Sequence, residues 1–383
     1  MPSRRGILKL IGGGVVLAAT GAGAFAALNQ PSRAAREAWR VAGTPAEYRR
    51  RFLSYALLAP NPHNMQPWLV RLDGDDAVTL YTDLARGLPE TDPFDRQILI
   101  GHGCFLELLT LAAADEGYVT DIEPFPEGAP ALTARLDTRP IAHVRFRPGA
   151  AAPDPHFAYA LTRRTNRNAY DARPVPADAL ARLTAAANRP GLTAQAIGEG
   201  DLAARLRDLT WRGHEREVTT PATWQESVDV MRIGPAEVAR HRDGLVLEGP
   251  MLAALNAAGI MTRETLADPT SQAFQQGLDM YRPLAASAPA FAWIANDGAS
   301  REGELSAGRG YLRLALEAEA QGLAIHPWSQ ALQEYPEMAE LYEQVHALIG
   351  NGQRLQMLVR AGYATSVLPA PRRGLAAHLI ETA

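Results

Sequence analysis

The 383-residue chain has one cysteine, Cys104, so it can form no internal disulfide and no metal site built from several thiolates. Its nine histidines show neither H-x-H nor H-x-x-x-H spacing, and the sequence therefore predicts no metal site. Lysine is almost absent, since Lys9 is the only lysine among the 38 basic residues. The formal net charge is −4, and because nucleic-acid binders are normally basic, we expect no nucleic acid among its partners.

The remaining composition is that of an ordinary globular protein. Apolar residues make up 47% and charged residues 21% of the chain, which excludes a disordered chain, a collagen-like repeat, a coiled coil and a multi-span membrane protein. The length suffices for about two domains of about 150 residues each. The strong preference for arginine over lysine is compatible with phosphate recognition, but codon bias in an alanine-rich chain also produces it.

The N-terminus has the three parts of an export signal. Arg4 and Arg5 precede an uncharged, Gly- and Ala-rich stretch over 10–28, which contains the small-x-small sequence Ala24-Phe25-Ala26. The paired arginines favour the twin-arginine route, whose translocon would then be a partner. A single membrane anchor is the alternative, although about nineteen residues barely span a bilayer. We expect residues 1–26 to be a twin-arginine export signal, cleaved or retained as an anchor, and the protein to be periplasmic or in the cell envelope.

The apolar pattern of the mature chain alternates between helical and strand periods. A helix over 48–58 must end before Pro60 and Pro62, because proline lacks the backbone donor of a helix interior. Two apolar runs around the polar turn 73–76 predict a hairpin. The other expected elements are an arginine-rich helical segment over 32–51, a long helix over 96–117, strands over 141–146 and 290–295, and a linker over 149–155.

Part of the helical pattern recurs 205 residues later. Gly103, Leu109, Leu111, Ala113 and Gly117 correspond to Gly308, Leu314, Leu316, Ala318 and Gly322. The repeat on its own does not exclude a chance match between two alanine- and leucine-rich helices. The triplets Gly101-His102-Gly103 and Gly308-Arg309-Gly310 lack the third glycine of a nucleotide loop and therefore favour close helix packing.

Residues 201–285 have no counterpart in the first part of the chain. Their pattern is helical, and they include Trp211 and Trp224. We interpret this stretch as an inserted helical lid.

Two segments combine residues suited to binding. Ala59-Pro60-Asn61-Pro62-His63-Asn64-Met65-Gln66-Pro67-Trp68 has three prolines in eight residues, which forbids a helix and predicts an extended turn. Its carboxamides offer both donors and acceptors, as a planar heterocycle requires, although the segment could equally be a helix stop with an aromatic anchor. Arg163, Arg164, Thr165 and Arg167 would suit a phosphate, or they form a solvated basic turn.

Together with the later segment 322–328 and the pair Arg372-Arg373, these motifs resemble the nitroreductases that bind flavin mononucleotide (FMN). The turn resembles the family element A-P-S-x-x-N-x-Q-P-W, and 163–167 resembles its R-R-S-x-R phosphate element. Gly322-Leu323-Ala324-Ile325-His326-Pro327-Trp328 resembles the G-L-G-x-x-P segment, which passes the reactive edge of the flavin. The export signal, the insert and the double length are most similar to the fused branch of Acg-type nitroreductase-like proteins. The resemblance covers residues 46–380.

The resemblance implies an α+β nitroreductase fold with two fused halves, 27–150 and 151–383, and the helical insert or lid within the second. In the family a flavin lies between two subunits, so the fused chain would be a pseudo-dimer, as a monomer or a homodimer. It implies one intact flavin site, because 187–191 lacks the Gln-Pro-Trp of the first turn and Arg49-Arg50-Arg51 lacks the hydroxyl. We expect the second site to be inactive and filled by the insert.

The site residues follow from the resemblance by position. Arg163 and Thr165 match phosphate ligands, helped by Arg372 or Arg373, and Arg167 matches a basic residue beside the flavin pyrimidine. Ser329 stands where a backbone N–H faces the flavin N5. Two departures are His63, in place of a small residue on the substrate face, and the pair Asn61-Pro62 in place of a serine. The expected FMN-binding set is Pro60, Asn61, Pro62, Asn64, Gln66, Arg163, Arg164, Thr165, Arg167, Pro327, Trp328, Ser329, Arg372 and Arg373.

No protein side chain is expected to be catalytic, because in such enzymes the flavin carries the hydride. The expected activity is hydride transfer through flavin N5 to a small electron-poor substrate such as a nitroaromatic or a quinone, with NAD(P)H a possible donor. Two alternatives remain: an exported FMN-binding protein that sequesters the flavin with little turnover, and a structural protein that has lost flavin. We expect contact with a membrane only through the signal or anchor.

Overall fold

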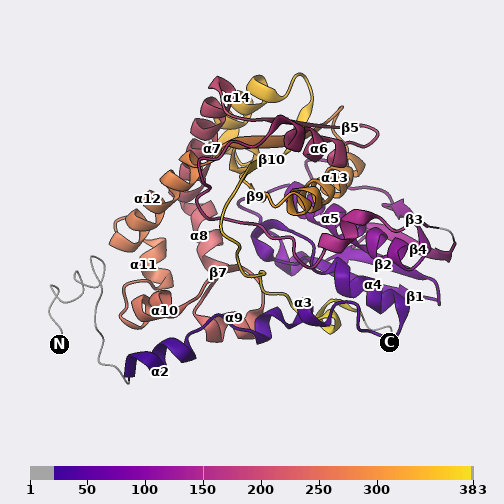
Figure 1. Cartoon of the computed structure of the whole chain (residues 1–383), viewed down its shortest axis with the longest axis horizontal. Helices are drawn as coiled ribbons and strands as arrows, with labels where there is room; N and C mark the ends of the chain where they lie inside the picture. The colour runs from indigo at the N-terminus through magenta and orange to yellow at the C-terminus, as the bar shows by residue number, and fades with distance from the viewer. Residues whose placement is uncertain (1–20, 150, 381–383) are drawn as a thin grey trace.

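The computed structural model describes residues 21–149 and 151–380, so the core of the predicted export signal, 1–20, lies outside the described residues. Two four-stranded antiparallel sheets dominate these residues (Figure 1). In spatial order the first sheet consists of β1 (Trp68–Asp73), β2 (Ala77–Thr82), β4 (Ala142–Pro148) and β3 (Tyr118–Pro124). The second sheet consists of β5 (Leu192–Ile197), β8 (Ala290–Asn296), β10 (Arg354–Gly362) and β9 (Ala324–Pro327).

The two sheets have the same topology. In each, the strands follow the spatial order first, second, fourth, third, and a helix precedes the first strand. A 20-residue helix joins the second strand to the third in both, α5 (Arg96–Asp115) and α13 (Arg301–Ala320). Their boundaries differ by the 205 residues of the sequence repeat. The prediction of an α+β chain with two related halves is thus confirmed, while the residue boundaries of the halves stay a prediction. The remaining helices outside the insert are α2 (Gly21–Leu28), α3 (Glu37–Val41), α4 (Tyr48–Ala56), α6 (Ala177–Ala187) and α14 (Ala339–Ile349).

The paired helices α5 and α13 cross at their repeated glycines. A Cβ on Gly103 would collide with the Leu305 carbonyl, and a Cβ on Gly308 would collide with the Ile100 carbonyl. Adding 205 to the number of Gly103 gives Gly308, and subtracting 205 from that of Leu305 gives Ile100. The repeat therefore turns each contact into the other, as two-fold symmetry does at the interface of a dimer. The expectation of close helix packing at these glycines is therefore confirmed, and the two halves meet like the subunits of a symmetric dimer.

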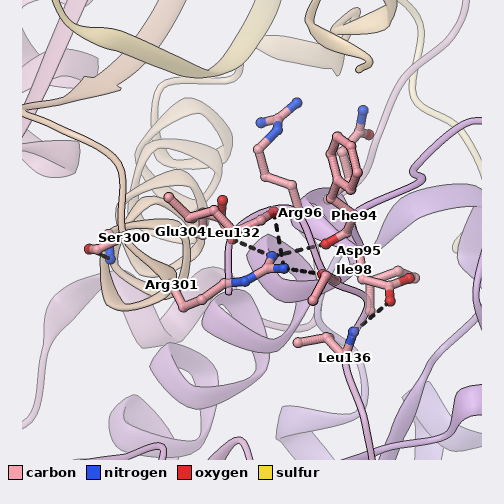
Figure 2. A network of polar contacts seen from close by, with 12 residues as sticks. Phe94, Asp95, Arg96, Ile98, Leu132, Leu136, Ser300, Arg301 and Glu304 are labelled. Atoms are coloured by element: carbon pink, nitrogen blue, oxygen red, sulfur yellow. Dashed lines mark hydrogen bonds and ion pairs between the residues drawn. The ribbon is translucent and has the colours of Figure 1, made fainter. Parts of the chain in front are cut away.

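The first residues of the two long helices repeat this symmetry. Arg96 donates to the carbonyls of Leu332 and Gln356, at 2.6 and 2.9 Å. Its counterpart Arg301 donates to the carbonyls of Phe94, Ala131, Leu132 and Ala134, and Figure 2 shows several of these contacts around its guanidinium. Each arginine is buried and binds backbone on the opposite half. Arginine supplies five donors, so one side chain can satisfy several carbonyls in a loop that has no ladder of its own.

The two sheets differ in how they are covered. In β1 buried and half-buried residues alternate, which is typical of a sheet with one face in the core. Every residue of β8 is buried, because Ala292 and Ile294 pack on the central core while Phe291 and Trp293 pack on α14 and the insert. The insert therefore covers the second face of the second sheet.

The insert lies between β5 and β8, where the first half has only the tight turn 74–76. Figure 1 shows its helices gathered on one side of the molecule, away from the first sheet. Besides helices it contains one pair of short parallel strands, which the sequence did not predict. Its elements are α7 (Asp201–Thr219), α8 (Pro221–Asp229), β6 (Met231–Ile233), α9 (Pro235–His241), β7 (Leu245–Leu247), α10 (Pro250–Ala257), α11 (Arg263–Ala267) and α12 (Gln272–Ala286).

Most local predictions agree with the structure, and one is wrong. The hairpin, the helices over 48–58 and 96–117 and the strands over 141–146 and 290–295 all form. The segment 32–51 is not one helix: α3 ends at Val41, and Gly43 with a φ of 81° turns the chain before α4. Of the described helices, α5 is long and apolar enough to cross a membrane, but it is mostly buried against its neighbours and belongs to the core.

The helix crossing can be tested by a single methyl group. Gly103→Ala should destabilise the protein by about 1–3 kcal/mol, because the new Cβ meets backbone atoms that cannot rotate away. Gly277→Ala in α12 is the matched control: no atom lies within 4 Å of its added Cβ, so it should stabilise by about 0.5–1 kcal/mol. Chemical denaturation measures both. Equal effects of the two variants would contradict close packing at Gly103.

Candidate functional site

The proline-rich turn between α4 and β1 has an unusual backbone. His63, Asn64 and Gln66 have positive φ values of 45°, 55° and 52°. Non-glycine residues rarely adopt this left-handed region, and such strain is found mainly at functional sites. The structure thus places three of the predicted site residues in one strained turn, whose centre is the short helix η2 (Pro62–Asn64).

Contacts from several parts of the chain hold this turn. Within it, the Asn61 side-chain oxygen accepts a hydrogen bond from the Gln66 amide at 2.7 Å. Gly101 of α5 lets the turn approach the helix, because a Cβ there would lie 3.2 Å from the Asn61 Cβ. The insert also contributes: the Gly244 amide donates to the Asn64 carbonyl at 3.2 Å, and the Gln66 carboxamide donates to the Arg242 carbonyl at 2.9 Å. The strain is therefore supported by tertiary contacts.

Three predicted arginines gather beside the beginning of this turn. Arg163 and Arg372 are buried, and both donate to the Leu58 carbonyl, at 3.3 and 3.1 Å. Arg164 is half-buried next to them. None of the three forms an ion pair with a carboxylate in the part of the chain that the structure describes, and the nearest acidic influence comes from Glu319. The Nη1 atom of Arg163 is buried and has no hydrogen-bond partner among these residues.

This arrangement makes the positive charges costly. Burial, with smaller contributions from Arg163 and Arg164, lowers the pKa of Arg372 to about 9. Burial and the neighbouring Arg163 lower the pKa of Arg164 to about 10, and burial also lowers the pKa of Arg163. Buried charges are normally paired, and no carboxylate among the described residues pairs with these three arginines. Forked arginine donors suit a phosphate group.

An aromatic residue that the sequence analysis did not select supports this arginine cluster. The indole of Trp39 lies under two of the guanidiniums, 4.7 Å from Arg164 and 5.5 Å from Arg372. Its N–H donates to the Ala370 carbonyl at 2.8 Å and thereby holds the C-terminal segment, which returns from the second half across the molecule (Figure 1). A cation over an aromatic ring is stabilised by the ring's negative face. No local motif marks Trp39, because its partners lie more than 100 residues away.

The structure separates the two C-terminal arginines. Arg372 joins the cluster, although its donors already bind the carbonyls of Leu57, Leu58, Ala59 and Pro371 and the side chain of Asn64. It therefore positions the end of α4 and contributes charge. Arg373 points elsewhere: it donates to the Gln66 carbonyl at 2.7 Å and lies 3.2 Å from the His378 ring. Of the two arginines expected to help Arg163, only Arg372 lies beside it.

The segment that contains Arg163 is fastened to the second sheet. The Asn166 amide donates to the Ile325 carbonyl on β9 at 2.8 Å, and its side chain donates to the Thr365 carbonyl at 2.8 Å. Thr165 is half-buried and Arg167 is exposed. The chain therefore brings the predicted phosphate segment next to the predicted edge segment 322–328, which is remote from it in sequence.

The other end of the site is lined by imidazoles. Burial and the charge of Arg167 lower the pKa of His63 to about 4, and burial, Arg167 and Arg360 together lower the pKa of His326 well below its usual value. Arg167 thus faces one histidine from the turn and one from β9. The Nδ1 atom of His63 is buried without a partner among the described residues. Both rings are neutral at pH 7, and they can donate or accept a hydrogen bond.

The insert reaches the segment 327–329 through aromatic side chains. The indole of Trp328 is buried, 5.9 Å from the ring of His214 on α7 and 6.5 Å from the ring of Tyr281 on α12. Pro327 pairs with Val359 of β10, and the Ser329 hydroxyl donates to the Leu358 carbonyl at 2.9 Å. These contacts fix Pro327, Trp328 and Ser329 on the side of the second sheet that the insert covers.

At the pseudo-symmetric position of the arginine cluster the chain carries its own anion. Cys104 lies near Arg163 in the first position. The repeat offset of 205 residues relates Cys104 to Arg309, so Arg309 marks the corresponding second position. Arg309 and Arg189 bind the buried carboxylate of Glu107 at 2.6 and 3.0 Å, and Arg313 binds it as well. From the sequence, the insert is expected to fill this second position. In the described residues a carboxylate from α5 neutralises the arginines there instead.

The donor set of the first position fits FMN. A buried guanidinium with an unpartnered Nη1, beside two further arginines, suits the phosphate. Unpartnered buried ring atoms at the other end, such as the Nδ1 of His63, suit a heterocycle with its own donors and acceptors. No group of three or more metal-ligating side chains occurs among the described residues.

Comparison with known proteins extends this description. No family model matches the chain. A Mycobacterium tuberculosis protein named "Putative NAD(P)H nitroreductase Rv3131" is 27% identical over 347 residues, which cover 86% of this chain and 90% of the relative. A second relative from the same organism, "Putative NAD(P)H nitroreductase acg", is 33% identical over 115 residues, or 29% of this chain and 32% of its own. The solved structure of the FMN-dependent nitroreductase NfnB from Mycobacterium smegmatis in complex with NADPH aligns over 58% of this chain and 95% of its own, with 19% identity and a TM-score of 0.36. The expected resemblance to nitroreductases is thus supported by a relative over most of the chain.

Proposed function

We propose that the chain is an FMN-dependent oxidoreductase of the nitroreductase type, with one flavin site. The observation that carries this proposal is the cluster of Arg163, Arg164 and Arg372, which lies against the strained turn and has no carboxylate partner among the described residues. Such a cluster is stable when an anion binds. The named NAD(P)H nitroreductase relative, which is similar over 86% of this chain, supports the oxidoreductase activity. The resemblance of the two motifs to those of FMN-binding nitroreductases supports FMN as the molecule that carries the anion.

The roles of the residues follow from their positions. Arg163 and Arg164 would hold the phosphate with Thr165, while Trp39 and Arg372 would keep the guanidiniums in place. The turn 60–66 would contact the ring system from the first half, with Asn64 and Gln66 held by the insert and the C-terminal segment. Arg167 would place a positive charge beside the pyrimidine end. When bound, FMN would supply hydride transfer from a donor such as NAD(P)H to a small electron-poor acceptor such as a nitroaromatic or a quinone.

The number of flavins tests the proposal. We expect the purified protein to be yellow and to release about one FMN per chain on acid treatment, because Glu107 already neutralises the second arginine cluster. Chromatography of the released cofactor and a visible spectrum measure this. Absence of flavin after reconstitution would contradict the proposed function, and two flavins per chain would contradict the single site.

A second candidate function is sequestration of FMN with little turnover. The observation that favours it is the contact between the insert and the site, through Gly244 at the turn and through His214 and Tyr281 at Trp328. An insert that excludes substrate would leave the flavin bound but unreactive. Steady-state oxidation of NADPH by the flavin-loaded protein, with and without a nitroaromatic, distinguishes the two functions, since only the oxidoreductase consumes NADPH faster when the acceptor is present.

We also propose that the chain is exported by the twin-arginine pathway, supported by Arg4, Arg5 and the apolar stretch behind them. Replacing both arginines by lysine keeps the charge but removes the arginine pair that the pathway reads. This variant should accumulate in the cytoplasm, where cell fractionation would detect it. Unchanged export of the double variant would contradict the assignment.

A further inference from the structure

His326 and Arg360 form a cross-strand pair at the edge of the site. They lie directly opposite each other in the register of β9 and β10, and the Arg360 Nε is 3.2 Å from the His326 Nδ1. Both side chains are buried. The remaining donors of Arg360 bind the Leu284 carbonyl and, at 2.9 Å, the Asn168 carbonyl, so its guanidinium is fixed by the insert and by the segment after Arg167.

This geometry decides which nitrogen of His326 carries the proton. An arginine Nε always bears hydrogen and can only donate. The Nδ1 of His326 must therefore accept, and the single proton of the neutral ring sits on Nε2. Protonating Nδ1 as well would place two donors against each other beside a buried cation. Arg360 thus makes His326 a neutral ring with one N–H.

The groups that face His326 from the surrounding elements agree with this assignment. They are Arg360 on β10, Arg167 on the phosphate segment and His214 on the insert helix α7. Each of them raises the cost of a positive charge on His326, and no carboxylate acts on the ring among the described residues. Trp328, one residue past the end of β9, places its ring 5.2 Å from that of His326.

We propose that Arg360 is a positioning residue that holds His326 as a fixed neutral N–H donor on the substrate side of the site, where it selects acceptors that carry an electron-rich oxygen and disfavours cationic ones. This inference rests on the proposed function, because it assigns a substrate preference to the same site. The groups at this end, Arg167, His326 and the neutral His63, supply donors and positive charge, and no carboxylate among the described residues acts on either ring. A neutral or anionic ring with nitro or carbonyl oxygens can accept these donors, whereas a cationic ring gains no partner and meets the charge of Arg167.

A first experiment determines the tautomer of His326 and does not depend on enzymatic turnover. Protein labelled with nitrogen-15 histidine should show His326, assigned by its loss in His326→Gln, as the Nε2–H tautomer. Its signals should not titrate between about pH 5 and about pH 8, the range in which an ordinary histidine changes charge. A proton on Nδ1, or a titration midpoint near the ordinary value, would overturn the proposal. Arg360→Lys should keep the tautomer, and Arg360→Met should release it. The measurement on the unchanged protein remains decisive if Arg360→Met does not fold.

A second experiment measures the selectivity. Flavin-loaded protein and His326→Phe are compared with 4-nitrobenzoate and with methylene blue, a cationic two-electron acceptor that carries no oxygen. Loss of one hydrogen bond to a charged or polarised oxygen should lower kcat/KM for the benzoate about tenfold, with a much smaller change for the cation. His326→Gln, which keeps an N–H, should retain most of the kcat/KM for the benzoate. Equal losses for both substrates would overturn the proposal. FMN titration of each variant is a separate readout: failure to bind FMN in the unchanged protein would contradict the proposed function instead.

Discussion

Arg163→Met should weaken FMN binding about tenfold to hundredfold and leave riboflavin binding nearly unchanged. The lost contact is a hydrogen bond between two charged groups, worth about 1.5–3 kcal/mol, which corresponds to that range of affinity. Riboflavin has no phosphate, so its affinity should not change. Titration of both ligands against the wild type and the variant, followed by flavin fluorescence, measures the difference.

The same substitution should not lower the stability of the protein without flavin. Arg163 is buried beside Arg164 and Arg372, and its charge has no carboxylate partner and its Nη1 no hydrogen-bond partner among the described residues. Methionine therefore removes a buried charge at similar volume. Such replacements are often neutral or stabilising. We therefore expect the flavin-free variant to melt no lower than the flavin-free wild type. A variant that loses both stability and affinity would indicate a structural role for Arg163 and contradict the phosphate assignment.

Two further variants complete this test. Arg145→Met removes an exposed arginine on the first sheet, where its ion pair with Asp76 is 3.6 Å long, and should change neither affinity. Arg167→Ala should weaken FMN and riboflavin alike, because Arg167 lies at the imidazole end of the site and not in the arginine cluster. If Arg163→Met weakens riboflavin as much as FMN, the motif assignment that underlies the fused-dimer interpretation is wrong.

The largest effect on stability is expected from Glu107→Leu. This carboxylate is 1% exposed and binds Arg189, Arg309 and Arg313, so its removal leaves three guanidiniums facing one another. Breaking a buried ion pair from one side costs about 3–5 kcal/mol. A loss of stability at the lower end of this range is expected for Glu107→Leu, because the three arginine side chains remain about a quarter exposed. The midpoint of urea unfolding measures the loss.

A more exposed glutamate just past the C-terminal end of α5 provides the control. Glu116→Gln removes a pair with Arg51 that is partly open to solvent, and it should cost less than about 1 kcal/mol. If Glu107 occupies the place of an anion, added phosphate or sulfate should restore part of the stability of Glu107→Leu and leave Glu116→Gln unaffected. A Glu107 variant that loses as little stability as the control would contradict the internal neutralisation of the second position.

The sequence by itself determined the local elements and the candidate residues. Prolines 60 and 62 require α4 to end before them, and the apolar alternation around 73–76 requires the first hairpin, because both depend only on residues that are neighbours along the chain. The repeat at an offset of 205 predicted two related helices, and the boundaries of α5 and α13 differ by that offset. The arginines of the phosphate segment could be selected because their chemistry is evident from residue type alone.

Only the tertiary structure decided which of those residues act together. Arg372 and Arg373 are adjacent in sequence, but Arg372 enters the arginine cluster and Arg373 binds the Gln66 carbonyl. They differ because their side chains leave the C-terminal segment in different directions. Trp39, Arg360 and Glu107 carry no motif, and each acquires its role from partners that lie far away in the sequence. Burial and the mutual placement of charges depend on the packing of distant segments, and a pattern read along the chain contains neither.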